Sequence, residues 1–259
     1  LGDWSISTNN NLMAYSTDLV SRREYRIQFK DLTTGEILSD RIDNTSGGIT
    51  WANDNKTIFY VKQDEVTLRS NKIFKHVIGT DSSEDALVFE EKDETFSCYV
   101  YKSKSTQYLF IVSYQTLSSE IWFLDADQPN GKWAVIQPRE RGLEYSVSHY
   151  ADDFYIRTNQ DAKNYKLMKT PVSSPSKENW EELIPPREDV FLSGLEIFKN
   201  FLVLNERENG LTQMRVINWL SGSEHYISFN DPTYSLYSST NLEFDTDIFR
   251  FSYSSLTTP

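Results

Sequence analysis

The sequence has a single cysteine, Cys98. One cysteine cannot form an intramolecular disulfide, so packing and hydrogen bonds must hold the fold. Because Cys98 stands in a strand-like segment between Phe96 and Tyr99, we expect a small core residue rather than a reactive thiol. An unpaired cysteine is also typical of a reducing compartment, which indicates a cytoplasmic protein.

Long apolar runs are also missing. The longest falls far short of the roughly 20 residues that a membrane-spanning helix needs, and no charged-then-apolar leader precedes the first predicted strand. No window keeps apolar residues at the spacing of an amphipathic helix. We therefore expect a soluble, non-helical protein with no membrane partner.

Basic residues are scarce relative to acidic ones. The chain has 26 Lys and Arg residues against 38 Asp and Glu residues, which gives a net charge of -12. Such a surface repels a phosphate backbone, so nucleic acid is not an expected partner. Basic or neutral partners are favoured.

Histidines number only three, at positions 76, 149 and 225. They fall in different segments without metal-ligand spacing, so we expect no metal and no cofactor. His76 is interpreted as a strand-surface residue or one lying between neighbouring sheets. The acidic pairs Asp152-Asp153 and Glu181-Glu182 could serve a glycosidase, but adjacent strand residues point to opposite faces, which favours solvated neighbours.

A repeat of about 45 residues, each copy with four strand-like segments, is the main feature that is present. First segments begin near Trp4, Ile49, Ser97, Tyr145, Phe191 and Leu236. Second segments are the most apolar, at residues 12–16, 57–61, 108–113, 154–157, 201–205 and 248–253. Unbroken apolar runs predict strands packed on both faces. The pattern predicts an all-β fold, a β-propeller with four-stranded antiparallel blades, of which five are complete and a sixth is partial.

The chain stops after the second strand of the sixth copy. A blade left open there would have unpaired backbone groups at its edge. We therefore expect residues 1–259 to be a β-propeller domain fragment of a longer protein, from a propeller of six or seven blades.

Loops that join second to third strands share one face of a propeller with the connections between blades. Here those segments carry many charges of both signs, as at residues 18–24, 90–94 and 206–210. This concentration predicts a partner docking on the charged loop face, and an ordinary solvated rim is the alternative.

Several segments taken in order resemble a known family. They include Ser21-Arg22-Arg23, Trp51-Ala52-Asn53-Asp54, Phe89-Glu90-Glu91-Lys92-Asp93-Glu94-Thr95-Phe96, Ile184-Pro185-Pro186-Arg187-Glu188 and Gly210-Leu211-Thr212. Across essentially the whole chain the sequence is similar to the prolyl oligopeptidase family of serine peptidases, in particular its oligopeptidase B branch. The resemblance implies a seven-bladed propeller inserted near the N-terminal end of an α/β-hydrolase domain, which would be a partner on the same polypeptide. The family's catalytic Ser, Asp and His belong to that domain, and no Gly-x-Ser-x-Gly motif occurs here, so we expect no catalytic residue in this chain.

The resemblance also implies a function. The parent enzyme would hydrolyse short peptides after Arg or Lys, with the propeller admitting only small flexible peptides, and acidic walls would concentrate short basic peptides. Glu90, Glu91, Asp93 and Glu94 are our candidates for an acidic rim at the substrate entrance.

Candidates for the interdomain interface lie in the second-to-third loops. Arg22 and Arg23 could form bidentate bonds to carboxylates of the hydrolase domain, and Glu206 and Arg207 are a weaker pair of the same kind. A noncatalytic β-propeller that binds a protein or peptide on its charged loop face stays open as the alternative, because fold does not determine function.

Overall fold

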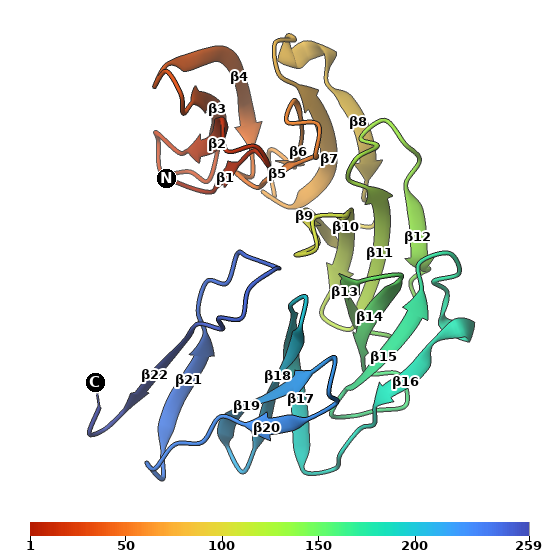
Figure 1. The fold of residues 1–259 in the computed structure, drawn as a ribbon. Helices are drawn as coiled ribbons and strands as arrows, with labels where there is room; N and C mark the ends of the chain where they lie inside the picture. The colour runs from red at the N-terminus through yellow and green to blue at the C-terminus, as the bar shows by residue number, and fades with distance from the viewer. Residues whose placement is uncertain (259) are drawn as a thin grey trace. The chain divides into compact units, whose positions relative to one another are not determined.

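Antiparallel strands make up nearly all the regular structure of residues 1–258, which are the residues that the computed structural model describes (Figure 1). No α-helix occurs in this range, and two 3-10 helices, η1 (Ser82–Glu84) and η2 (Lys177–Asn179), lie in connections. The chain divides into two compact units, Leu1–Glu140 and Arg141–Pro259. None of the helices in residues 1–258 is long and apolar enough to cross a membrane.

The first unit contains three four-stranded sheets, each with its strands in chain order. Sheet 1 consists of β1 (Trp4–Ile6), β2 (Leu12–Thr17), β3 (Tyr25–Asp31) and β4 (Ile37–Thr45). Sheet 2 consists of β5 (Ile49–Trp51), β6 (Thr57–Gln63), β7 (Ser70–Val77) and β8 (Ala86–Glu90). Sheet 3 consists of β9 (Ser97–Lys102), β10 (Tyr108–Gln115), β11 (Ser118–Asp125) and β12 (Ala134–Gln137).

The second unit contains two four-stranded sheets and a two-stranded one. Sheet 4 consists of β13 (Tyr145–Tyr150), β14 (Asp153–Thr158), β15 (Lys166–Pro171) and β16 (Glu181–Ile184). Sheet 5 consists of β17 (Val190–Ile197), β18 (Phe201–Glu208), β19 (Leu211–Asn218) and β20 (Glu224–Tyr226). Sheet 6 consists of β21 (Tyr234–Ser238) and β22 (Phe251–Ser255).

The predicted blade pattern is confirmed, with five four-stranded antiparallel sheets and a partial sixth. The second strand of sheet 6 was predicted three residues too early, because pairing with β21 starts only at Phe251. The Asn241 side chain accepts a hydrogen bond from the backbone N–H of Arg250 and donates one to its carbonyl. The carbonyl of Arg250 still accepts a hydrogen bond from the backbone N–H of Ser239 at 3.0 Å, whereas its N–H bonds the Asn241 side chain, so the regular ladder begins only at Phe251.

Hydrophobic cores lie between successive sheets within each unit. One core joins sheets 1 and 2 around Phe29 and Trp51, and the next joins sheets 2 and 3 around Phe59 and Leu109. Cys98 belongs to this second core, where burial raises the pKa of its thiol to about 12, so the prediction of a core cysteine is confirmed.

First strands of neighbouring sheets are also tied by hydrogen bonds. The Trp51 indole N–H donates to the carbonyl of Ser5 at 3.0 Å, and the Thr50 hydroxyl donates to the carbonyl of Val100 at 3.1 Å. These bonds hold β5 between β1 and β9, so the first strands of the three sheets in the first unit are linked.

Candidate functional site

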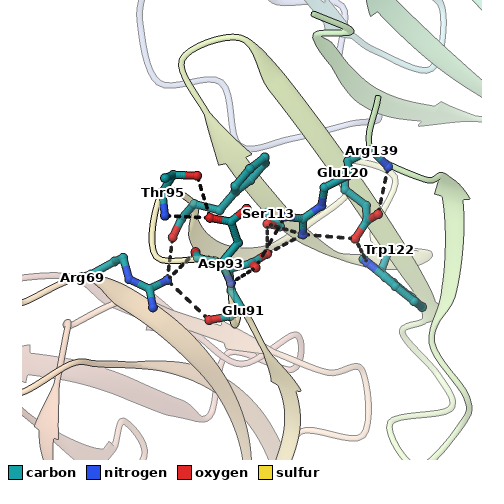
Figure 2. A network of polar contacts seen from close by, with 9 residues as sticks. Arg69, Glu91, Asp93, Thr95, Ser113, Glu120, Trp122 and Arg139 are labelled. Atoms are coloured by element: carbon teal, nitrogen blue, oxygen red, sulfur yellow. Dashed lines mark hydrogen bonds and ion pairs between the residues drawn. The ribbon is translucent and has the colours of Figure 1, made fainter. Parts of the chain in front are cut away.

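A buried carboxylate, that of Glu91, organises the connection between β8 and β9 (Figure 2). Glu91 is only 4% exposed, and its Oε2 accepts a hydrogen bond from the Arg139 guanidinium at 2.5 Å. The Ser113 hydroxyl donates to the same oxygen, and the backbone N–H of Asp93 donates to Oε1 at 2.8 Å. Every oxygen of this carboxylate therefore has a donor.

Arg139 comes from the connection after β12 and links three parts of the first unit. Its guanidinium also lies 3.5 Å from a Glu120 carboxylate oxygen, and its backbone N–H donates to the other oxygen at 2.9 Å. The guanidinium stacks 4.0 Å from the ring centroid of Phe96. Figure 2 shows Glu120 lying between Arg139 and Trp122, whose indole N–H donates to it.

Arg69 secures the same connection from the β6–β7 side. One guanidinium nitrogen donates to the backbone carbonyls of Glu91, Asp93 and Phe96, at 3.4, 3.2 and 2.7 Å. The shape of the β8–β9 connection is thus set by two arginines, one acting on its backbone and one on its buried carboxylate.

The charges in this network are mutually stabilised. Burial raises the pKa of Glu91, but hydrogen bonds from Arg139 and Ser113 outweigh burial, so the pKa of this carboxyl lies below its usual value. Burial likewise lowers the pKa of Arg139, and its bonds to Glu91 and Glu120 raise it more. Glu91 is ionised, paired and closed to solvent, which suits a structural carboxylate and not a general base.

The second unit has a network of the same design around Glu206, on β18. This carboxylate is 1% exposed and lies 2.5 Å from the Arg187 guanidinium and 3.6 Å from that of Arg215. The Tyr226 hydroxyl donates to Glu206 at 2.8 Å and accepts from Arg187 at 3.1 Å. In both units, then, an arginine from a connection between sheets neutralises a buried glutamate near a second-to-third hairpin.

No group of three or more His, Cys, Asp or Glu side chains in residues 1–258 could hold a metal ion. Each unit thus contains a buried glutamate that is ion-paired to an arginine from a connecting segment. A family model described as prolyl oligopeptidase, N-terminal β-propeller domain, matches residues 1–259. The chain belongs to the prolyl oligopeptidase family.

Relatives within the prolyl oligopeptidase family support the same placement. Dipeptidyl aminopeptidase BI from Pseudoxanthomonas mexicana is 41% identical over 100% of this chain, and Protease 2 from Moraxella lacunata is 34% identical over 98%. The structure of oligopeptidase B from Leishmania major is 31% identical with a TM-score of 0.93, and it covers 99% of this chain and 38% of its own. The resemblance predicted from the sequence is confirmed. The chain spans 36% of the length of both curated relatives.

The predicted acidic rim is divided by the structure. Glu90, Asp93 and Glu94 are exposed, whereas Glu91 is buried beneath them. Glu90 lies 3.7 Å from Lys72, and the Asp93 carboxylate accepts bonds from the backbone N–H and hydroxyl of Thr95, which lower its pKa. We remove Glu91 from the rim, because a carboxylate enclosed by Arg139 cannot meet a substrate.

Arg22 and Arg23 lie exposed in the β2–β3 hairpin of this propeller domain. The Asp18 carboxylate shapes the hairpin by accepting hydrogen bonds from the backbone N–H groups of Val20, at 3.0 Å, and Arg23, at 2.7 Å. Arg23 has a positive φ of 62°, and its carbonyl accepts a bond from the Gln63 amide at 2.7 Å. The hairpin backbone is held in place, and within residues 1–258 neither guanidinium has an ion pair.

Glu206 and Arg207 prove to be different kinds of residue. Arg207 is exposed, whereas Glu206 is the buried partner of Arg187. Adjacent strand residues point to opposite sides, which is why one neighbour is enclosed and the other is not. Of this pair, Arg207 is the exposed residue, so the interface prediction is kept for Arg207 and withdrawn for Glu206.

The sequence analysis missed Arg139 and Arg187 as the partners of these glutamates. Each lies in a Pro-Arg-Glu triplet, at 138–140 and 186–188, and the two triplets stand one repeat apart. The recurrence of this triplet in equivalent connections could have indicated that the two arginines have the same structural role.

Proposed function

We propose that this chain is the substrate-filtering propeller of a serine oligopeptidase that hydrolyses short peptides after Arg or Lys. The observation that carries the proposal is the likeness to oligopeptidase B, at 31% identity over 99% of the chain. The α/β-hydrolase domain of the same polypeptide would supply the catalytic residues. Short basic peptides are the proposed substrates.

Charge supports this choice of substrate. With a net charge of -12, the propeller attracts cationic peptides and raises their concentration near an opening lined by carboxylates. Glu90, Asp93 and Glu94 are exposed, the first at the end of β8 and the other two on the connection that Arg69 and Arg139 hold in shape. We assign the acidic rim to these three residues.

The substrate class is tested with the intact protein and two matched peptides. We expect cleavage after arginine in a blocked hexapeptide, and no cleavage when norleucine replaces that arginine, because norleucine keeps the apolar stem without the charge. Products are identified by mass spectrometry. Equal cleavage of both peptides rules out basic specificity, and no cleavage of any peptide supports a noncatalytic binding propeller.

A second activity is favoured by one comparison, the 41% identity to a protein named dipeptidyl aminopeptidase BI. An enzyme of that kind would release dipeptides from a free N-terminus. A peptide with a free amino group and its acetylated twin separate the two proposals. Cleavage of both supports the oligopeptidase, and dipeptide release from the free peptide alone supports the aminopeptidase.

Arg22 and Arg23 are proposed to hold the closed arrangement of the two domains. Arg23→Ala in the intact protein should lower kcat/KM for a short arginyl peptide about tenfold, since a charge-assisted hydrogen bond contributes about 1.5 kcal/mol. Alanine keeps the Cβ atom, so the hairpin backbone is preserved. Steady-state kinetics and the radius of gyration from small-angle scattering measure the effect.

Arg250→Ala is the control, because Arg250 is exposed in a first-to-second loop of sheet 6. We expect it to change neither kinetics nor compactness. Wild-type kinetics and compactness in Arg23→Ala would remove this residue from the interface.

A further inference from the structure

His76 is buried between two carboxylates that belong to different sheets. Its side chain is fully enclosed, and it lies on β7 in sheet 2. Its Nδ1 lies 2.7 Å from a carboxylate oxygen of Asp85, in the β7–β8 connection of the same sheet. Its Nε2 lies 3.4 Å from a carboxylate oxygen of Asp40, on β4 in sheet 1. Of the two predicted positions, on a strand surface or between neighbouring sheets, the second is confirmed, and the imidazole is a polar link across that boundary.

The protonation state of the ring decides whether both links exist. An ionised carboxylate only accepts hydrogen bonds, so each ring nitrogen needs a proton to bond its aspartate. The imidazolium has both protons, whereas the neutral ring has one. After deprotonation a ring nitrogen lone pair faces a carboxylate oxygen on one side.

The surroundings indicate which side is released. Asp85 also accepts from the Tyr60 hydroxyl at 2.8 Å, and its bond to Nδ1 is the shorter of the two. The Asp40 carboxylate also accepts a hydrogen bond from the backbone N–H of Gly79. Together with Arg41 and Asp81, Asp40 lines a surface pocket of about 420 Å³. The Asp40 side chain is only 5% exposed where it faces His76, but the adjoining pocket leaves room for its carboxylate to turn outward, so Asp40 is the partner that can leave.

The groups that face His76 favour its protonated form. Burial lowers the pKa of His76, but Asp85 first and Asp40 second raise it more, so the pKa lies above its usual value. Asp81 is a third nearby carboxylate, and Tyr60, on β6, is a titratable neighbour that bonds Asp85. The uncharged ring of Phe29, on β3, stacks on the imidazole with centroids 5.8 Å apart.

We propose that His76 is a pH-dependent clamp between sheets 1 and 2. As the imidazolium it bridges Asp40 and Asp85. When it loses its proton, Asp40 turns into the adjoining pocket and β4 loosens from sheet 2. Because the folded-state pKa is raised, the stabilisation is complete below the pKa of an unfolded histidine and is lost as pH rises through the folded pKa.

The test combines two measurements on the intact protein. An NMR titration of the His76 ring gives its pKa. Hydrogen exchange of peptides that cover β4, Ile37–Thr45, gives the opening of this strand between about pH 6 and pH 9, after correction for intrinsic exchange rates. We expect opening to increase about tenfold for each unit by which the His76 pKa exceeds that of an exposed histidine. A pKa at or below 6.5, or exchange of β4 that does not change with pH, overturns the proposal.

Asp40→Asn is the decisive variant. Its amide can donate to the neutral Nε2, so the link forms without the second proton and the pH dependence of β4 exchange should vanish. His225→Gln, at an exposed histidine in sheet 5, should behave as the wild type. An Asp40→Asn protein that keeps the full wild-type pH dependence contradicts the clamp.

Discussion

Replacing Arg139 by methionine is expected to lower the free energy of unfolding by about 3 kcal/mol, since removing one partner of a buried ion pair leaves a charge uncompensated. Glu91, which is 4% exposed in the wild type, would keep only the Ser113 hydroxyl and the Asp93 N–H as donors. We place the effect at the lower end of the usual range because the Arg139 side chain is 31% exposed. Methionine puts an unbranched apolar side chain of similar length next to Phe96, in place of the guanidinium that stacks on its ring. Urea unfolding followed by circular dichroism measures the loss.

Two variants show whether the buried charge is the cause. Arg141→Met, at an exposed arginine two positions away, should change stability by no more than about 0.5 kcal/mol. The double variant Arg139→Met/Glu91→Gln should recover about half of the loss, because no charge then stays buried. A double variant as unstable as Arg139→Met alone would show that lost packing explains the effect.

Trp51→Ala is expected to cost about 4 kcal/mol, since truncating a buried aromatic side chain removes its transfer free energy and leaves a cavity. Trp51 is 2% exposed, packs edge-to-face on Phe29 with centroids 6.1 Å apart, and donates to the Ser5 carbonyl. The substitution therefore removes apolar contact and a hydrogen bond from the same boundary between sheets 1 and 2. Denaturant unfolding gives the size of the loss.

Hydrogen exchange locates the damage of Trp51→Ala, which should appear first in β1 and β5. Trp4→Ala is the matched control, because Trp4 is 52% exposed and should contribute less than about 1 kcal/mol. Trp51→Phe should cost about 1.5 kcal/mol, since it keeps a ring and loses the indole donor. Equal losses for Trp4→Ala and Trp51→Ala would mean that the boundary core does not hold the sheets together.

Strand positions could be predicted because they depend on local pattern. The runs at 57–61 and 108–113 are apolar at every position or nearly so, and the observed strands β6 and β10 begin at Thr57 and Tyr108. The error at β22 lies where the Asn241 side chain, and not a strand partner, accepts the backbone N–H of Arg250. A bond of that kind depends on where two loop segments meet, and propensity does not describe it.

Residue roles on the loop face were harder to predict. Glu90, Glu91, Asp93 and Glu94 look alike in sequence, yet one carboxylate is enclosed and three are exposed. The difference arises because Arg139 and Ser113 reach Glu91 from the connection after β12 and from β10. For His76 the sequence indicated either a strand surface or a place between sheets, and the two aspartates that face it come from separate segments.

The amino-acid sequence by itself determined the repeat, the strand order, the single core cysteine and the family, because each of these is recorded in local spacing or in similarity along the chain. Tertiary structure alone decided which charged groups are buried, which of them form hydrogen bonds or ion pairs with each other, and which charged groups stay exposed. Burial and pairing are properties of neighbours that folding brings together from different sheets, and their energies depend on distance and solvent exclusion that a linear pattern does not contain.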